Sequence, residues 1–299
     1  MSKLSVMILM GGPDAERNVS IESGNAVVEA LKQSERFEVS SQIIDTPTIN
    51  DILKINSDIV FPVLHGPFGE GGPLQQLLEK AGLPYVGSCS KTSANAMDKV
   101  TTKEIAKEAV IQTPEWCTVS NCQECTIQTP LVIKPINDGS SLDLKICHTE
   151  DQFIHAKTGL LQIHKTMLVE SYVKGREVTV GIINGKPLPI IEIKPPADLQ
   201  SYDYEAKYER NDTQYLFDSD LPNNSCVQDA IKLYKLMGIR DLARADFIVN
   251  QCGSWFLEIN TMPGFTSHSL VPMAARHIGI SMVDLCSELV ENVACRLVK

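Results

Sequence analysis

The sequence lacks the features that mark membrane, secreted and nucleic-acid-binding proteins. It has no apolar run long enough to span a membrane, and the apolar part of its opening segment, MSKLSVMILMGG, is too short for a signal peptide. It also lacks a long basic run, and its formal net charge is −10. We therefore expect a cytoplasmic protein with no nucleic-acid or membrane partner, in which any positive charge that handles anions is concentrated locally.

The sequence also lacks a disulfide framework. Its nine cysteines are an odd number scattered through 299 residues, which indicates reduced thiols. One stretch, CTVSNCQEC, places Cys117, Cys122 and Cys125 at part of the plant-type iron–sulfur spacing. Because so short a pattern is loosely specified, a chance match in a polar surface loop is the simpler interpretation, and an iron or zinc site is the alternative.

The first third of the chain alternates apolar runs with segments of helical spacing. The expected elements are buried strands at 5–12, 57–66 and 83–88 and helices at 20–33, 73–82 and 93–109. Such alternation is typical of an α/β layer structure. The first turn, GGPDAE, lacks the G-x-G-x-x-G spacing of a dinucleotide-binding oxidoreductase, so that class has little support.

The second region has a different pattern, with short strands separated by Gly, Pro and Asn. We expect an antiparallel sheet with one or two helices, and a long polar, Tyr-rich loop at 200–217. The expected elements are strands at 130–135, 142–147, 166–173, 177–185 and 186–194, a helix at 225–238, a hairpin of 242–250 with 254–260, and a helical end from about residue 270. The chain is long enough for two or three domains.

The hairpin carries polar side chains inside apolar strands. Because side chains alternate along a strand, Glu258 and Asn260 share one face, and so do Arg244 and Asp246. A buried carboxylate needs a partner. One interpretation is an Arg244–Glu258 salt bridge; the other is a Mg²⁺ site, because carboxylate and amide oxygens are the ligands that Mg²⁺ prefers.

Two lysines favour a phosphate site nearby. Lys134 ends the apolar run PLVIK, and Lys99 lies in a helical stretch. A lysine at the inner end of a buried strand must have its charge met, and phosphate could meet it. The loop INDGSSLDL follows Lys134, and its backbone N–H groups could hold phosphate oxygens, although most such loops are plain turns. Glu170 and Glu177 end and begin strands where a carboxylate could accept hydrogen bonds from a nucleotide; ordinary surface charge is the alternative.

These motifs occur together in a recognisable order. They are GGPDAERNVSIESG, LHGPFGEGG, AMDK, VIKPINDGSS, ESYVKGRE, YDYEAKY, ARADF and EINTMPGFTSHS. In this order, and at close to this spacing, the chain resembles the ATP-grasp enzymes over nearly its whole length, and specifically the D-alanine–D-alanine ligase family. The resemblance implies ATP-dependent ligation of two D-alanine molecules through an acyl phosphate, for peptidoglycan precursor synthesis.

The resemblance also implies a fold. It is a mixed α/β (α+β) structure of three domains, in which ATP is held between two antiparallel-sheet domains. The expected ranges are an N-terminal parallel-sheet, substrate-binding domain at 1–95, a central ATP-grasp subdomain at 96–178, and a C-terminal subdomain with metal and substrate residues at 179–299. The expected co-substrate is ATP, with two Mg²⁺ ions that Mn²⁺ could replace, and a homodimer is expected.

Roles for individual residues follow from the resemblance alone. The residues expected at ATP are Lys99, Lys134, Ser141, Glu170, Val173, Glu177 and Lys207, with Glu170 and the Val173 backbone at adenine and Glu177 at ribose. The metal ligands would be Asp246, Glu258 and Asn260. The residues expected at D-alanine are Glu16 for the first ammonium, Ser269 and Leu270 for the second carboxylate, and His65 nearby. Arg244 and the Gly264 backbone would stabilise the tetrahedral intermediate, and Ser140 and Tyr208 would bond to each other and to Glu16.

The chain departs from the family's pattern at a few positions. Asp143 stands where the phosphate loop usually has glycine, and Gly71 stands where Asp is usual. A carboxylate facing triphosphate would repel it, and a non-Gly residue resists positive φ, so we expect Asp143 to weaken ATP binding. The alternatives are therefore an ATP-grasp ligase for other amino acids or D-lactate, or a nucleotide-binding protein with impaired turnover.

Overall fold

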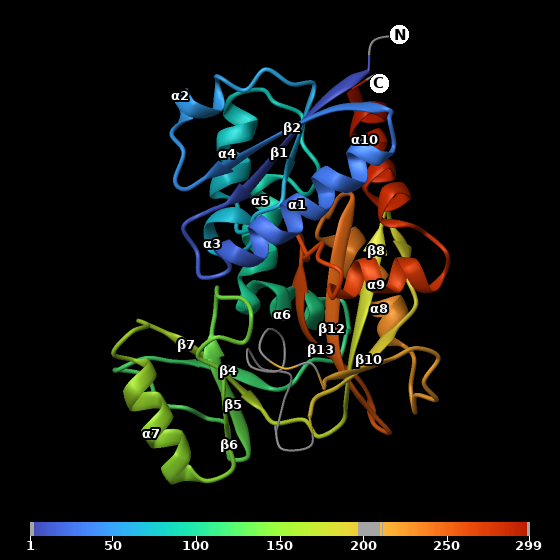
Figure 1. Ribbon diagram of the computed structural model, residues 1–299. Coiled ribbons are helices and arrows are strands. Elements are labelled where there is room, and N and C mark those ends of the chain that lie inside the picture. The colour runs from blue at the N-terminus through green and yellow to red at the C-terminus, as the bar shows by residue number, and fades with distance from the viewer. Residues whose placement is uncertain (1–2, 197–209, 211, 298–299) are drawn as a thin grey trace.

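The computed structural model describes residues 3–196, 210 and 212–297, and it contains three sheets (Figure 1). The N-terminal sheet is parallel, as the sequence predicts, and its strand order is β2-β1-β3. Its strands are β1 (Leu4–Gly11), β2 (Phe37–Ile44) and β3 (Ile59–Pro62), and the helices of this part are α1 (Arg17–Gln33), α2 (Ile49–Ile52), α3 (Gly66–Gly69) and α4 (Pro73–Lys80).

Two strand predictions in this part are wrong. Residues 83–88 form no third strand, because Tyr85 makes only an isolated parallel bridge to Val60 before the chain turns away. Strand β2 was not expected, and the reason is visible in its burial. Apart from its two ends and Val39, its residues are exposed at the sheet edge, so the apolar run that marks a buried strand is missing.

The central sheet is antiparallel, with order β4-β7-β5-β6, and the helix α7 (Glu150–Leu160) covers one face. Its strands are β4 (Trp116–Val119), β5 (Leu131–Pro135), β6 (Lys145–Cys147) and β7 (Met167–Ser171). A small separate core lies between sheet and helix, built around Ile133, Val169 and Phe153. The sheet carries the expected lysine, because β5 ends at Lys134 and Pro135.

The C-terminal sheet is also antiparallel and holds the predicted hairpin. Its path is β11-β10-β8-β12-β13, with β9 paired to β8. The strands are β8 (Arg176–Ile183), β9 (Lys186–Pro187), β10 (Ile191–Lys194), β11 (Gln214–Leu216), β12 (Leu242–Asn250) and β13 (Gly253–Asn260), and the later helices are α8 (Cys226–Leu236), α9 (Leu270–His277) and α10 (Met282–Leu297).

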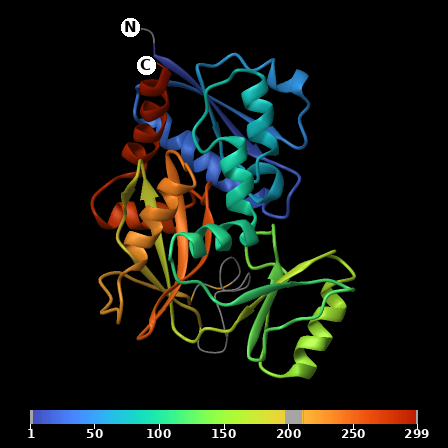
Figure 2. The same ribbon diagram turned by 180° about the vertical axis from the view of Figure 1, so that it is seen from behind.

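The helical stretch predicted at 93–109 is two helices, α5 (Ser90–Met97) and α6 (Lys99–Glu108). The break falls at Asp98, whose side chain accepts a hydrogen bond from the Thr101 backbone N–H and caps α6. Lys99 is therefore the first residue of a helix. Both helices pack on β13, and from behind α6 lies between the C-terminal and central sheets (Figure 2).

The N-terminal and C-terminal parts share one core. Side chains of β1, β3 and α1 pack with those of α9 and α10 in a single buried cluster, which includes Phe61 and Phe265 in edge-to-face contact. The C-terminal helix α10 packs directly on α1. The domain ranges 1–95, 96–178 and 179–299 stay predictions. Helix α6, from the range 96–178, packs on β13 of the C-terminal sheet, and α10, from the range 179–299, packs on β3 of the N-terminal sheet.

Candidate active site

A cavity of about 470 Å³ lies between the central and C-terminal sheets. A second cavity, of about 370 Å³, extends from it toward the N-terminal part. We call them the nucleotide pocket and the substrate pocket. Arg244, Glu258 and Leu270 line both, so the two pockets meet at these residues.

Every predicted site residue that the structure describes lines one of these pockets. The predicted site residues that line the nucleotide pocket are Lys99, Lys134, Ser141, Glu170, Val173, Glu177, Arg244, Asp246, Glu258 and Leu270. The substrate pocket takes Glu16, His65, Ser140, Asn260, Gly264 and Ser269. Lys207 and Tyr208 lie outside the described residues. The roles of all these residues stay predictions, but their convergence from distant parts of the chain is a structural fact.

The hairpin presents its polar side chains in the predicted register. Arg244 pairs with Asn260 and Asp246 with Glu258 across β12 and β13. A β-bulge follows directly, where the register shifts between Asp246 and Phe247. The bulge leaves Leu257 as an extra residue, so that Leu257 and Glu258 both line the nucleotide pocket although they are adjacent.

The acidic residues are held by specific partners. The Arg244 guanidinium donates to Asp246, with Nη2–Oδ2 at 2.8 Å and Nε–Oδ1 at 3.0 Å. The Thr179 hydroxyl donates to Asp246 Oδ1 at 2.6 Å. Lys99 Nζ lies 3.4 Å from Glu258. The salt-bridge interpretation named Arg244 as the partner of Glu258; a lysine from a different element lies beside that carboxylate.

The opposite wall is basic and deeply buried. The Glu170 carboxylate lies between two lysines, 2.5 Å from Lys103 Nζ and 2.8 Å from Lys134 Nζ. Burial alone would raise the pKa of Glu170, but the two ammonium groups outweigh it and the net pKa is lowered. For Lys103 the effect of burial prevails: it lowers the pKa of the ammonium group to about 8, although the charge of Glu170 opposes the shift. Each carboxylate oxygen of Glu170 therefore lies beside one lysine ammonium group.

Sequence reasoning missed Lys103. The available signal was its spacing, because a residue four positions after Lys99 on one helix lies on the same face. Its ammonium also donates to the Thr113 hydroxyl at 2.6 Å, and that hydroxyl donates to the Phe256 carbonyl at 2.8 Å. Lys103 therefore links α6, the central sheet and β13.

The loop from Asp138 to Leu144 closes one side of both pockets. Its Ser140 hydroxyl donates to the Glu16 carboxylate, which is the contact that the sequence predicts for this pair. A Cβ atom on Gly139 would lie 2.9 Å from Glu16 Oε2, so a side chain at this position would have to displace the end of the Glu16 side chain. Lys99 Nζ donates to the Asp138 carbonyl at 2.6 Å. The expectation that Asp143 faces the phosphate site is wrong, because its carboxylate bonds to the His164 ring instead.

The substrate pocket holds a buried histidine with one free nitrogen. His65 Nδ1 lies 3.0 Å from the Met262 carbonyl, which can only accept, so Nδ1 carries the proton. Burial lowers the pKa of His65, which keeps the ring neutral. Nε2 is buried and has no hydrogen-bond partner among the described residues. His65 therefore presents a lone pair to the pocket.

Glu70 is a second residue that sequence reasoning missed. Its carboxylate accepts hydrogen bonds from the backbone N–H groups of Gly66 and Met262, both at 3.3 Å. Burial, reinforced by the charge of Glu16, raises the pKa of Glu70 to about 8.

Gly71, which stands where the family usually has Asp, has a structural reason. A Cβ on Gly71 would lie 2.3 Å from the Pro67 carbonyl oxygen, so this turn requires glycine.

The cysteine stretch lies apart from both pockets. Cys117 Sγ and Cys125 Sγ are 3.6 Å apart beside the core under α7, while Cys122 is exposed. Within the described ranges no three His, Cys, Asp or Glu side chains are grouped as metal ligands. In the same residues, no helix is both long and apolar enough to traverse a bilayer.

Two antiparallel sheets that enclose a pocket, one wall lysine-rich and the other carboxylate-rich, with a parallel-sheet domain closing the end, define an ATP-grasp enzyme. Family models support this class over most of the chain: D-ala D-ala ligase C-terminus matches residues 93–291, and D-ala D-ala ligase N-terminus matches residues 45–88. The chain belongs to the D-alanine–D-alanine ligase family.

Individual relatives agree with this assignment. A D-alanine–D-alanine ligase of Aquifex aeolicus is 38% identical over 293 residues, covering 96% of this chain and 100% of that protein. One of Acinetobacter baumannii is 36% identical over 296 residues, covering 96% and 95%. The crystal structure of the Bacillus anthracis ligase complexed with ATP matches with a TM-score of 0.84 at 28% identity, covering 98% of each chain.

Proposed function

We propose that this chain uses ATP to join two D-alanine molecules through an acyl phosphate, and that the dipeptide serves peptidoglycan precursor synthesis. The observation that carries the proposal is the meeting of the two pockets at Arg244, Glu258 and Leu270. A nucleotide in one pocket and an amino acid in the other would bring their reacting ends together there. Family membership supports the choice of substrates.

The basic wall is suited to the phosphates. Lys99 and Lys134 reach the nucleotide pocket from α6 and β5, and Ser141, Leu142 and Leu144 line the same pocket. Such groups neutralise charge without covalent chemistry, so the protein would contribute positioning and electrostatic stabilisation. Val173 and Glu177 line the same pocket, and by family resemblance they would hold adenine and ribose.

The acidic wall fits Mg²⁺. Asp246, Glu258 and Asn260 each carry a hard oxygen donor of the kind Mg²⁺ prefers, and all three lie on the hairpin of β12 and β13. When bound, Mg²⁺ would neutralise charge that develops on the transferred phosphoryl group. Thr179 and Arg244 hold Asp246 in place through its side-chain oxygens.

The first D-alanine would lie in the substrate pocket with its ammonium at Glu16. Its carboxylate would attack the γ-phosphate, ADP would leave as the bond to the γ-phosphorus breaks, and the product would be an acyl phosphate, which is a far better acyl donor than a carboxylate. The amine of the second D-alanine would then attack the acyl carbon, and phosphate would leave. Arg244 and the Gly264 backbone N–H would stabilise the oxyanion, and a Cβ on Gly264 would collide with Ser269 Oγ at 2.6 Å.

His65 fits the second amine better than a carboxylate. Its Nε2 is a buried acceptor without a hydrogen-bond partner among the described residues, on a ring that lines the substrate pocket, so it can receive a hydrogen bond from an amine N–H. A carboxylate needs a donor, and the start of α9 offers the Ser269 hydroxyl and the Leu270 backbone N–H. The second D-alanine would therefore bind between His65 and the start of α9.

The decisive assay is phosphate release from ATP, measured with D-alanine, with D-lactate, with other amino acids and without an acceptor. D-alanine-dependent release with D-alanyl-D-alanine as the product supports the proposal. Release that requires D-lactate or another amino acid would assign the chain to a different ligation. ATP binding without any release would identify a nucleotide-binding protein that has lost turnover.

Two expectations have no structural test of their own. We propose a homodimer, which the mass in solution by light scattering would check. We also propose a cytoplasmic location, because the substrates of the proposed reaction are ATP and free amino acids; fractionation of cells would check it.

A further inference from the structure

The loop from Asp138 to Leu144 contains residues in a left-handed backbone conformation, which non-glycine residues rarely adopt unless other contacts hold them there. Ser140, Ser141 and Asp143 have φ of 55°, 55° and 57°. This left-handed region is disfavoured for side chains with a Cβ, so three such residues in four positions must be held by surrounding contacts. At Asp143 the family pattern expects glycine, which would adopt this φ freely.

Two side-chain contacts restrain the loop. At its N-terminal part, the Ser140 hydroxyl bonds to Glu16 on the N-terminal side of the pocket. At its C-terminal part, Asp143 Oδ2 lies 2.7 Å from His164 Nε2. His164 Nδ1 also lies 3.9 Å from the Asp138 carboxylate, so the ring stands between two carboxylates of the same loop. These two contacts brace the strained segment from both ends.

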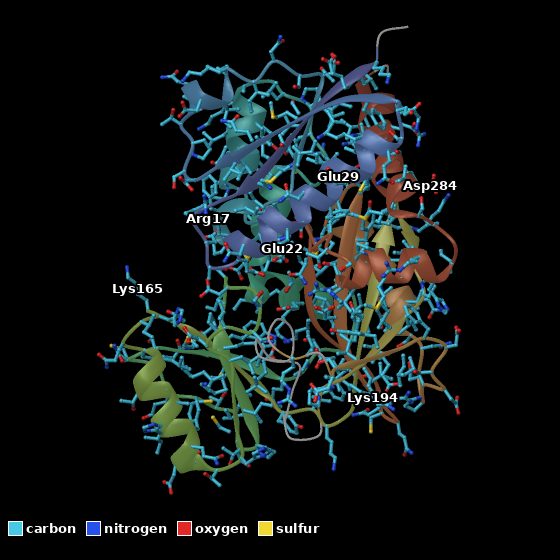
Figure 3. The ribbon with its side chains drawn as sticks, in the orientation of Figure 1. Arg17, Glu22, Glu29, Lys165, Lys194 and Asp284 are labelled. Atoms are coloured by element: carbon cyan, nitrogen blue, oxygen red, sulfur yellow. The ribbon has the colours of Figure 1, made fainter. Side chains whose placement is uncertain are left out.

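His164 is itself fixed in place. Its backbone N–H donates to the Leu160 carbonyl at 2.9 Å, which ties it to the end of α7, and β7 begins three residues later. Its neighbour Lys165 extends from the outer edge of the central domain (Figure 3). The side chain of His164 is 20% exposed. The ring is therefore held beside the end of α7 and reaches the loop at Asp143.

The contact decides which groups face the nucleotide pocket. Ser141, Leu142 and Leu144 line the pocket, and the carboxylate between them is turned onto His164. The repulsion expected between Asp143 and a triphosphate is thereby avoided. Lys99 contacts the same loop by donating to the Asp138 carbonyl.

We propose that His164 is a positioning residue for ATP: it holds the Asp143 carboxylate out of the nucleotide pocket and braces the strained loop whose backbone faces the phosphates. The pair then replaces, in this chain, the conformational freedom of the usual glycine. The proposal rests on the proposed function only in taking ATP as the ligand of the nucleotide pocket.

If the Asp143–His164 pair only stabilised the fold, its loss would have a different effect on ATP binding. The Asp143 side chain is 41% exposed, and exposed ion pairs contribute little to stability. If the pair were only such a surface contact, its loss would leave nucleotide affinity unchanged. The two roles are therefore separated by binding, measured independently of stability.

The test is calorimetry of a non-hydrolysable ATP analogue with Mg²⁺ on six proteins: wild type, His164→Ala, His164→Gln, Asp143→Gly, the double variant of His164→Ala with Asp143→Gly, and His155→Ala as a control at an exposed histidine of α7. We expect His164→Ala to weaken binding about tenfold, the order of one charge-assisted hydrogen bond. Asp143→Gly should bind at least as tightly as wild type, and the double variant should return to within about twofold of it. His164→Gln, which keeps a donor, should lose less than His164→Ala.

Two outcomes overturn the proposal. One is wild-type affinity in His164→Ala; the other is a double variant as weak as His164→Ala, which would mean that His164 does not act through Asp143. The D-alanine assay separates these failures from failure of the proposed function. A wild type that binds the analogue but releases no phosphate with D-alanine refutes the ligase and leaves the His164 test intact.

Discussion

The two walls of the nucleotide pocket contrast in charge and in burial. On one side Lys103, Lys134 and Glu170 form a closed cluster whose side chains are 0%, 7% and 2% exposed. On the other side Arg244, Asp246 and Glu258 are 19%, 12% and 23% exposed. The basic wall is internally paired and closed to water, whereas the acidic wall keeps polar groups open to the pocket.

This difference assigns different tasks to the two walls. A closed cluster holds its charges in fixed positions and has a high cost if one partner is removed. A partly open set of carboxylates can still accept a ligand, because some of its oxygen lone pairs face the cavity. We therefore expect changes in the basic wall to affect folding first, and changes in the acidic wall to affect turnover first.

The largest effect should come from Glu170→Gln. The amide would leave Lys103 and Lys134 buried without their counter-charge, and removing one partner of a buried pair costs about 3–5 kcal/mol. Urea unfolding would measure the loss, with Glu108→Gln, an exposed residue of α6, as the control. A loss below about 1 kcal/mol would contradict the closed-cluster description. The ATP analogue should stabilise this variant more than wild type, since phosphate supplies the missing negative charge.

The acidic wall should respond in the opposite way. Glu258→Gln should lower kcat by about 10²–10³-fold, because an amide is a poorer Mg²⁺ ligand than a carboxylate, while the melting temperature stays near that of wild type. Phosphate release and thermal unfolding would be measured on the same preparation. Glu29→Gln, on the exposed side of α1 (Figure 3), is the control. Near-normal ligase activity in Glu258→Gln would make Glu258 a structural residue and remove the metal assignment.

The substrate pocket offers a smaller, pH-dependent effect at Glu70. Its folded-state pKa of about 8 exceeds the usual 4.5, so between these values the native state binds a proton that the unfolded state has released. Stability contributed by Glu70 is therefore lost as pH rises from about 5 to 8. Glu70→Gln cannot ionise and should flatten this decline, as urea midpoints at pH 5 and pH 8 would reveal. Parallel profiles for wild type and variant would mean that Glu70 is ionised in the native state.

The sequence predicted the acidic wall better than the basic wall, because the residues of the acidic wall lie close together in the sequence. Arg244, Asp246, Glu258 and Asn260 lie on one hairpin, where strand periodicity alone places them on a common face. The bulge that brings Leu257 to the pocket leaves no such signal. The basic wall joins α6 to β5 and β7 through Lys103, a contact between elements far apart in the sequence that periodicity cannot supply.

Departures from a family pattern were harder to interpret. The position of Asp143 in the sequence led us to expect repulsion between its carboxylate and the ATP phosphates. The residue that turns this carboxylate away is His164, which lies 21 residues later in a turn that matches no motif. The edge strand β2 was missed for a related reason, because its exposed residues carry no apolar run. In both cases the deciding information is which residues become neighbours after folding.

The smallest predicted effect compares two helix caps, one at the basic wall and one remote from it. The Asp98 side chain accepts from Thr101 N at 2.8 Å at the start of α6, directly before Lys99, and Thr149 accepts from Gln152 N at 3.3 Å at the start of α7. Loss of either cap should cost about 1 kcal/mol of stability. Only Asp98→Ala should also weaken binding of the ATP analogue, by a few fold, because it frees the first turn that carries Lys99.

The conservative change Asp98→Asn keeps a capping oxygen and should restore both properties. Urea unfolding and calorimetry on Asp98→Ala, Asp98→Asn and Thr149→Ala would separate the two caps. Equal losses of affinity in Asp98→Ala and Thr149→Ala would mean that ATP binding follows overall stability. In that case the basic wall would owe its geometry to the Glu170 cluster rather than to the start of α6, since the ion pairs of Lys103 and Lys134 would remain in place without the cap.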